Sequence, residues 1–323
     1  MANWEIPPRG GHMDLADGVY FQNMTGKQVE ERLKKNDIIL IPIGSTENHG
    51  AGAPYGEDTF LVTRMAEQIA LKTGCTVAQP LWYGSHPWGH LGMPGTVVVP
   101  EDIFLGMIRA MIAGFWNAGF RKQILLNGHG QEYVIPTAIH EFMKKYQVPA
   151  ILVFLNWPTV IPNYLKDKAN GGAVFETPFR HADEAETSYS MALFPEMVHL
   201  EDAVDTHPHG FFPEGHIDKG GDIFQRPIPG HGQAGLSHLE VIAYPEGVIG
   251  RPTLASGEKA REGLRVLLDY AVKLIEDIKE RFPPGVLPPA SDITQRPAED
   301  IDAVLKGPFK RGGRHIYTIH YPP

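Results

Sequence analysis

Short apolar segments alternate with amphipathic segments over the first half of this chain. The apolar segments, which have the length and composition of buried strands, are 37–43, 76–82, 123–127 and 149–155. The amphipathic segments, in which apolar residues recur at helical spacing, are 58–73, 101–115 and 131–146. Such alternation builds right-handed βαβ units and a parallel sheet, and strands that are apolar throughout are covered on both faces. We therefore predict an α/β fold in which a mostly parallel sheet has helices on both faces.

The second half of the chain contains two further predicted helices, at 183–194 and 257–282. Between them, residues 205–250 are rich in His, Gly and Pro and show little periodicity. A loop of that length inside a compact domain is typical of a functional or partner-binding segment. Residues 283–323 form a Pro-rich tail, suited to wrapping another subunit. We expect one domain over 1–282, with the loop insertion 205–250, followed by this tail.

Charge and cysteine content narrow the classes of function. The 323 residues carry a net charge of −9 without a basic stretch, which argues against nucleic-acid binding. Cys75 is the only cysteine, so the chain has neither an internal disulfide nor a thiolate zinc site. The N-terminal residues lack a signal-peptide pattern, and no apolar run reaches membrane-spanning length. We expect a cytoplasmic protein without a membrane or nucleic-acid partner.

The loop after the first predicted strand carries Glu47 and His49, and Asp58 opens the following helix. In an extended segment, residues two apart face the same side, so Glu47 and His49 can point together. Open α/β sheets bind ligands at the carboxyl ends of their strands, where this loop is expected to lie. Asp58 alone is explained equally well as a helix N-cap.

Two more groups of polar residues follow along the chain. His129 leaves the third strand within Asn127-Gly128-His129-Gly130, whose glycines allow a sharp turn close to a ligand. The alternative is a tight turn with an incidental histidine. His181 precedes the acidic residues of 183–186, which the dipole of a starting helix would also favour.

Together these groups place histidines and carboxylates at one edge of the predicted sheet. Imidazole and oxygen ligands without thiolate suit Zn²⁺, Mn²⁺ or Fe²⁺. An aspartate able to bridge two ions favours a two-metal hydrolytic site. The sequence has neither the Gly-x-Ser-x-Gly elbow of serine hydrolases nor a phosphate-binding P-loop.

The sequence resembles the creatininase (creatinine amidohydrolase) family at five segments, which occur in family order. They are Gly44–Gly50 with Asp58, Gly84–Thr96, Asn127–Gly130, His181–Ser188 and Gly247–Ser256. The resemblance implies a creatininase-like layered α/β fold and a homo-oligomer, commonly a hexamer. It also implies two divalent metal ions, which would be zinc, manganese or iron.

The resemblance assigns most of the ligands. Glu47, Asp58 and His129 would bind one metal, and His49 with Asp58 would bind the other, which makes Asp58 the bridge. His181 would be a catalytic proton shuttle near the attacked carbonyl.

One ligand of the second metal departs from the creatininase pattern. Creatininase supplies a glutamate two residues after the Asn-Gly-His histidine, and Gln131 occupies that position here. Relatives with the sequence His-Ala-Gly-Glu use the glutamate of that motif, which corresponds to Glu184. Glu184 is therefore the expected fifth ligand and Glu186 the alternative, with Asp183 replacing the usual glycine of this turn.

Members of the family hydrolyse a cyclic amide, a formamide on a pyrimidine nucleotide, or a cyclic β-diketone. The chain length, the His-rich segment and the tail are most similar to the diketone hydrolases. We expect metal-activated water to attack a ring carbonyl, with C–C hydrolysis of the cyclic β-diketone 3-dehydro-scyllo-inosose in inositol catabolism as the best candidate. A cyclic amide is the alternative substrate, and a non-catalytic metal- or carbohydrate-binding scaffold is a remote third. The expected substrate-binding residues are His86, Trp88, His90 and Gln131.

Overall fold

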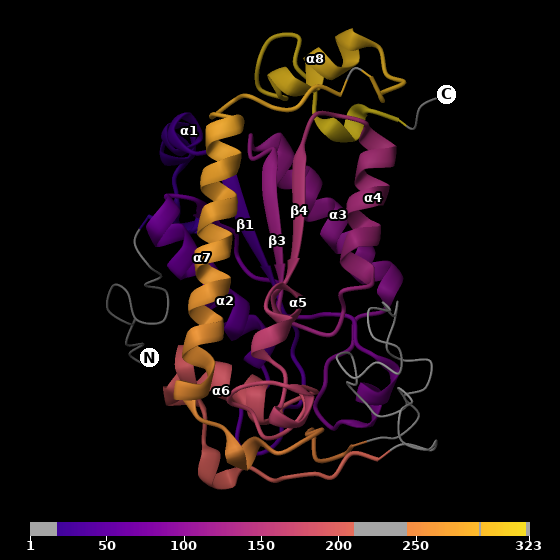
Figure 1. Cartoon of the computed structure of the whole chain (residues 1–323). Helices are drawn as coiled ribbons and strands as arrows, with labels where there is room; N and C mark the ends of the chain where they lie inside the picture. The colour runs from indigo at the N-terminus through magenta and orange to yellow at the C-terminus, as the bar shows by residue number, and fades with distance from the viewer. Residues whose placement is uncertain (1–17, 210–243, 291, 321–323) are drawn as a thin grey trace, which may run out of the picture.

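The protein is built around a 4-stranded sheet in which every neighbouring pair of strands is parallel. The computed structural model describes residues 18–209, 244–290 and 292–320. In the order β2-β1-β3-β4, the strands are Thr76–Val77, Ile38–Ile43, Lys122–Asn127 and Ile151–Asn156. Helices cover both faces of this sheet (Figure 1). The predicted α/β fold is therefore confirmed.

Three strands end at the same level. In the register between β1 and β3, Ile43 pairs with Asn127, and between β3 and β4, Asn127 pairs with Asn156. Because the strands are parallel, the loops that leave them emerge side by side at one edge of the sheet. The polar residues predicted at strand ends therefore meet there.

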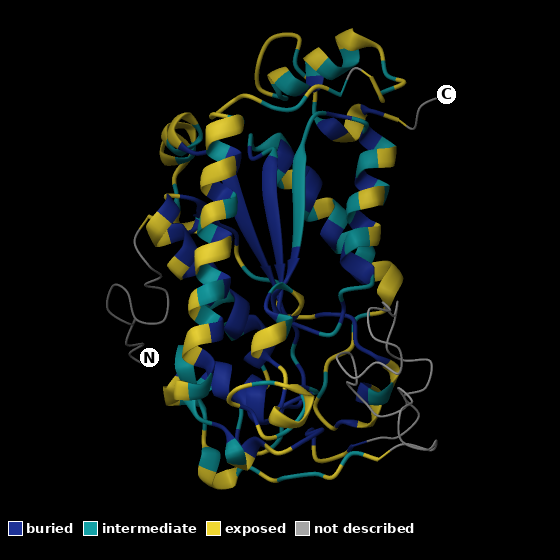
Figure 2. Ribbon diagram, in the orientation of Figure 1, coloured by how far each residue is buried: buried dark blue, intermediate teal, exposed yellow. Residues whose placement is uncertain are grey.

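The side chains of each strand alternate between two apolar cores. Ile38 and Leu40 of β1 face one core, and Ile39 and Ile41 face the other. The first core is closed by α2 (Glu57–Thr73), α6 (Glu184–Leu193) and α7 (Gly257–Arg281). The second is closed by α3 (Glu101–Asn117) and α4 (Val134–Tyr146). Figure 2 shows β1 and β3 buried, and most of β4 half-buried, between these partly exposed helices.

Two elements, β2 and α1, differ from the sequence prediction. The strand expected at 76–82 pairs regularly only over Thr76–Val77, and Leu81 forms an isolated bridge with Ile43. Pro80 lies between them and has no N–H to donate to the ladder. The helix α1 (Gly26–Lys35) was not predicted, although Thr25 and Gln28 form a capping box at its start.

The C-terminal segment packs on its own chain. It contains α8 (Ala298–Lys306), and its side chains Val304, Ile316 and Ile319 are buried in the core that α3 and α4 cover. Lys122, at the start of β3, binds the carbonyl oxygens of Phe282 and Pro283. The tail therefore lies at the amino ends of the strands, away from their carboxyl ends (Figure 1).

The described parts of the chain include no helix that is long and apolar enough to cross a membrane. Most of the predicted loop insertion 205–250, namely residues 210–243, falls outside the described residues. The short helix α5 (Trp157–Val160) directly follows β4 and lies at the same edge as the loops after β1 and β3 (Figure 1).

Candidate metal centre

The loop after β1 brings Glu47 and His49 into the interior. The Glu47 N–H donates to the Tyr55 carbonyl at 2.8 Å, and this bond closes the loop. The Glu47 carbonyl oxygen lies 3.1 Å from Nδ1 of His49, so Nδ1 donates and Nε2 is left to face the centre. Both side chains are almost completely buried. Their i, i+2 spacing therefore places them together, as predicted.

Histidines from three further segments surround the Glu47 carboxylate. Oε2 lies 2.9 Å from Nδ1 of His129, which follows β3. Oε1 lies 3.8 Å from Nδ1 of His86 and 3.8 Å from Nε2 of His181, and it also pairs with Nδ1 of His90. A buried carboxylate among imidazoles is a typical metal-ligand arrangement.

Asp58 lies between His129 and His49. Its Oδ2 is 3.0 Å from Nδ1 of His129, and its Oδ1 is 3.5 Å from Nε2 of His49. Ser45 donates to Oδ2 at 2.6 Å and fixes the carboxylate. The N-cap of α2 is Gly56, so Asp58 belongs to the first turn and is not the cap. Its geometry suits a ligand shared by two ions.

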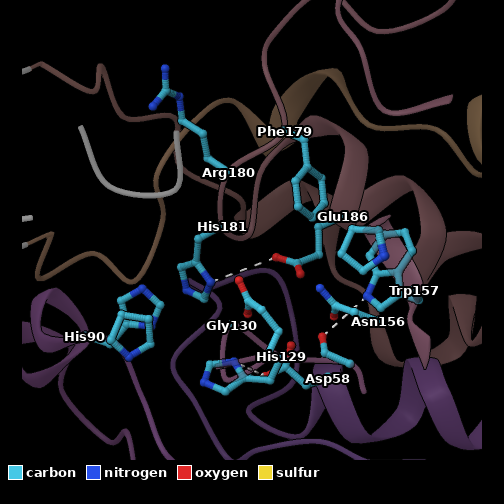
Figure 3. A pocket seen from close by; sticks show the side chains of 14 residues that line it. Asp58, His90, His129, Gly130, Asn156, Trp157, Phe179, Arg180, His181 and Glu186 are labelled. Atoms are coloured by element: carbon cyan, nitrogen blue, oxygen red, sulfur yellow. Dashed lines mark hydrogen bonds and ion pairs between the residues drawn. The ribbon is translucent and has the colours of Figure 1, made fainter. Parts of the chain in front are cut away.

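Glu186, on α6, closes the other side of the centre. Its Oε2 is 3.9 Å from Nε2 of His49 and 3.9 Å from Nδ1 of His181, and it accepts the Ala182 N–H at 2.6 Å. Figure 3 shows Glu186, His181, His129 and Asp58 directed toward one cavity. The alternative glutamate of the sequence analysis thus lies with the other expected ligands.

Glu184 lies elsewhere. Its carboxylate accepts the N–H groups of Glu176 and Thr177 at 2.8 and 2.9 Å, and it pairs with Lys259. Successive helical residues are 100° apart, so positions two apart on α6 face nearly opposite sides. Asp183 caps α6 by accepting the N–H of Ala185 and Glu186. The acidic run therefore serves both as a helix start and, through Glu186, as part of the cluster.

Several buried polar atoms of the cluster make no hydrogen bond of regular geometry within the described chain. They are both carboxylate oxygens of Glu47, Nε2 of His49, Nδ1 of His86, Nδ1 of His90 and Nε2 of His129. Buried polar groups nearly always have a hydrogen-bond partner, so an accumulation of unpaired oxygen and nitrogen atoms indicates a site for a further partner, such as a metal ion. Carboxylate oxygens and imidazole nitrogens are the ligands of zinc, manganese and iron, so these residues fit such ions. The compatible groups are Glu47 with His86, His90 and His129; Glu47 with His49 and His181; and His49 with Asp58 and Glu186.

Charge within the cluster shifts the pKa values of its members. Burial raises the pKa of Glu47, but the surrounding histidines, His129 foremost, outweigh burial and hold it well below its usual value. Burial lowers the pKa of His129, but Glu47 and Asp58 outweigh this and raise it to about 10. Burial lowers the pKa of His181 to about 3, which keeps this imidazole neutral. In the cluster, protonated histidines therefore balance the carboxylates, a role that divalent ions can take over.

A cavity opens onto the centre. On one side it is lined by Asp58, His90, His129, His181 and Glu186, and on the other by Glu132, Asn156, Trp157, Pro158, Phe179 and Arg180. The second group was missed by the sequence analysis. The available signal was the end of the fourth predicted strand, because Asn156 and Trp157 follow the same strand-end rule as the other site residues.

The four predicted substrate-binding residues have different environments. His90 lines the cavity, whereas Trp88 is 58% exposed on the surface. Gln131 is completely buried: it accepts the Ser85 N–H at 3.0 Å and donates to Gly44 and Asn127 at 3.1 Å each. Its amide thus ties the strand-end loops together. His86 is buried against Glu47, outside the lining of the cavity.

Comparison with known proteins identifies the family. The sequence model of the creatininase family, described as creatinine amidohydrolase, matches residues 22–275. The chain belongs to the creatininase family. Creatininases are metal-dependent hydrolases, so the family assignment agrees with the donor set of the cluster.

Two curated relatives and one solved structure place the chain within the creatininase family. The 3-dehydro-scyllo-inosose hydrolase of Thermotoga maritima is 62% identical over 306 residues, which are 95% of this chain and 98% of the relative. The creatinine amidohydrolase of Pseudomonas putida is 26% identical over 283 residues, 84% of this chain and 100% of the relative. A mutant creatininase complexed with creatine aligns with a TM-score of 0.62 at 25% identity and covers 83% of this chain and 100% of its own. Among solved creatininases of this fold, one is described as a manganese form and another as a Zn–Zn form.

Proposed function

We propose that this protein is a metal-dependent hydrolase that opens the ring of 3-dehydro-scyllo-inosose by C–C cleavage in inositol catabolism. The observation that carries the proposal is the 62% identity, over almost the full length of both chains, to a relative of that name. The buried histidine–carboxylate cluster at the sheet edge supports it, because it offers the ligands that such chemistry needs.

In this proposal the two ions share Asp58. Glu47 and His129 would hold one ion, and His49 and Glu186 would hold the other. When bound, such ions supply an activated water and polarise the carbonyl under attack. Ser45 and the Glu47 carbonyl keep Asp58 and His49 oriented, as residues behind a metal site commonly do.

His181 would carry the proton that the reaction moves. Its Nε2 lies 2.9 Å from the Asn48 carbonyl, so Nε2 donates there and Nδ1 stays free of a proton on the side of Glu186. Burial lowers its pKa to about 3, so the ring is neutral between turnovers and holds a proton from water only until it passes that proton on. Hydrolysis adds OH to the carbonyl carbon and breaks the C–C bond. The electron pair of that bond leaves as an enolate, and its carbon takes the proton from His181.

The remaining wall of the cavity would receive the ring of the substrate. Trp157 and Phe179 meet edge to face, with ring centroids 5.6 Å apart, and form an apolar surface. Glu132, Asn156 and Arg180 add polar groups that suit the hydroxyls of a polyol ring. An apolar face with a few placed polar groups is the usual design of a small-molecule site.

A cyclic amide is the second candidate substrate, because a creatinine amidohydrolase is 26% identical over its full length. The same centre would serve, with nitrogen as the leaving atom. Release of an amine product from lactams or cyclic ureides would identify this activity.

The deciding experiment is turnover of 3-dehydro-scyllo-inosose by Mn²⁺- or Zn²⁺-loaded protein, followed by ultraviolet absorbance, with a chelated control. An enolised β-diketone absorbs strongly, so C–C hydrolysis removes the absorbance and releases one carboxylic acid. We expect chelator-sensitive loss of absorbance, and a decrease of at least about 100-fold in Glu47→Gln and Asp58→Asn, since each removes a metal ligand. Bound metal without any loss of absorbance would contradict the diketone substrate. No turnover of amides either would favour a non-catalytic scaffold.

We also propose a cytoplasmic homo-oligomer, a hexamer by family resemblance, in which 1–282 is the hydrolase domain and 283–323 an added tail. Its mass by light scattering would be six times that of the 35.7 kDa chain. A monomeric mass would contradict the assembly and leave the proposed chemistry intact.

A further inference from the structure

His86 is a buried histidine of the cluster for which the proposed chemistry has no use. Its side chain has 0% exposure and it does not line the cavity, so it is not placed to touch a substrate. The centroid of its ring lies 4.5 Å from that of His129. A polar ring in this position needs a reason beyond packing, because burying imidazole costs hydration.

The orientation of the His86 ring is set by a backbone carbonyl. Nε2 lies 3.3 Å from the Val97 oxygen, and a carbonyl can only accept, so Nε2 carries the proton. In the neutral ring, Nδ1 is then an unprotonated acceptor. A histidine that donates one N–H to a carbonyl and directs its other nitrogen inward has the arrangement that metal-bound histidines almost always show.

The free nitrogen of His86 faces an acceptor. Nδ1 lies 3.8 Å from Oε1 of Glu47 and has no hydrogen-bond partner within the described chain, and Oε1 also pairs with Nδ1 of His90. Two lone pairs directed at each other repel, so this arrangement is favourable only with a cation between them. Ligand atoms of Glu47, His86, His90 and His129 all lie within 4.8 Å of one another, which a single ion can span after small side-chain movements.

We propose that Nδ1 of His86 is a ligand of the ion held by Glu47, Asp58 and His129. That ion then has four protein ligands, two of them imidazoles. His90 pairs with the same carboxylate and also lines the cavity, where a substrate can reach it. The inference rests on the metal centre of the proposed function and is independent of the substrate.

The test uses two substitutions that separate the two ring nitrogens. In His86→Gln the amide reaches the position of Nε2, so the Val97 contact is kept and the metal ligand is lost. In His86→Asn the amide lies near the position of Nδ1, so a donor atom remains and the Val97 contact is lost. We expect one of the two ions to bind more than about 100-fold more weakly in His86→Gln, with a smaller loss in His86→Asn, because losing a ligand exceeds the effect of losing its support. Affinities are measured by chelator competition and metal content, and the visible spectrum of Co²⁺-substituted protein is expected to change in His86→Gln.

Controls make each outcome decisive. Trp88→Ala, an exposed position two residues along the same loop, is expected to keep both ions and the cobalt spectrum. X-ray absorption counts metal-bound imidazoles directly: if the proposal holds, His86→Gln has one fewer than the unaltered protein, and if it does not, the two counts are equal. Parental affinity and spectrum in His86→Gln, or a greater loss in His86→Asn, would overturn the proposal. If His86 proves to be a ligand and the diketone is not opened, the substrate assignment fails and this inference stands.

Discussion

At the scale of single residues, Glu184 and Glu186 show how two carboxylates two positions apart on one helix acquire different surroundings. Glu186 faces His49 and His181, whereas Glu184 binds Lys259 and two backbone N–H groups. We expect Glu186→Gln to lose one of the two ions and at least about 100-fold in turnover, since it removes a ligand. Metal content after dialysis and turnover per folded protein are the measurements.

The matched variant is Glu184→Gln. It should keep both ions and lose about 1–3 kcal/mol of unfolding free energy, because it weakens buried hydrogen bonds. Denaturant unfolding measures this loss. Loss of an ion in Glu184→Gln, with full metal content in Glu186→Gln, would reverse the assignment.

Metal binding is expected to release protons. The pKa of His129 is raised to about 10 and that of His49 well above its usual value, because in both cases the nearby carboxylates outweigh burial. Both rings are therefore protonated at pH 7 in the metal-free protein and must lose the proton to bind an ion. Calorimetry in two buffers of different ionisation enthalpy should report at least two protons released as the ions bind, because burial also raises the pKa of the proposed ligand Glu186. Release of none would show that the rings are neutral without metal.

The raised pKa of His129 also determines how the stability of the metal-free protein changes with pH. The folded pKa of His129, about 10, exceeds the unfolded value of roughly 6.5. Its contribution to the stability of the metal-free protein is thus complete below about pH 6.5 and is lost as the pH rises through 10. We expect the Tm of chelated protein to fall across this range. The fall should be smaller in His129→Gln, which has no titrating ring.

At the scale of elements, the contact between strand ends and the first turn of α2 determines the position of Asp58. A Cβ added at Gly128 would lie 2.3 Å from the Asp58 carbonyl oxygen, whereas one added at Gly130 would meet nothing closer than 3.5 Å. Gly128→Ala is therefore expected to displace the start of α2 and to weaken metal binding. We expect it to lower the free energy of unfolding by about 1–3 kcal/mol. Gly130→Ala is the control and should bind metal normally. Unfolding curves and metal content test both, and equal behaviour of the two variants would contradict this account.

Elements differ in how well the sequence predicts them. α2, α6 and α7 are predicted within one residue, because apolar periodicity and residues such as Gly74, which ends α2 in the left-handed conformation, define their limits. β2 is predicted too long, because the apolar run continues past Pro80 while the ladder does not. α1 is missed because its face is mostly exposed and polar, which leaves its capping box as the main signal.

At the scale of the whole molecule, the C-terminal tail and the metal centre lie at opposite ends of the sheet (Figure 1). Ile316 is completely buried in the core that α3 and α4 cover, and Phe309 is 100% exposed. We expect Ile316→Ala to cost about 2–5 kcal/mol of unfolding free energy while turnover of folded, metal-loaded protein stays unchanged. Phe309→Ala should change neither. A loss of turnover without a loss of stability in Ile316→Ala would mean that the tail acts on the site.

The sequence alone determined the parallel α/β fold and the segments that supply the centre, because periodicity and strand-end loops are local properties of the chain. The strand-end pattern also placed Glu47, His49, Asp58 and His129 at one edge, and the family resemblance added His181 to them. The different surroundings of Glu184 and Glu186 needed the tertiary structure, because they depend on which face of α6 is turned toward the histidines of the cluster. The same is true of His86 and of the Trp157–Phe179 wall. Their roles follow from contacts with residues far away in the sequence, such as the Val97 carbonyl, and no local pattern encodes those contacts.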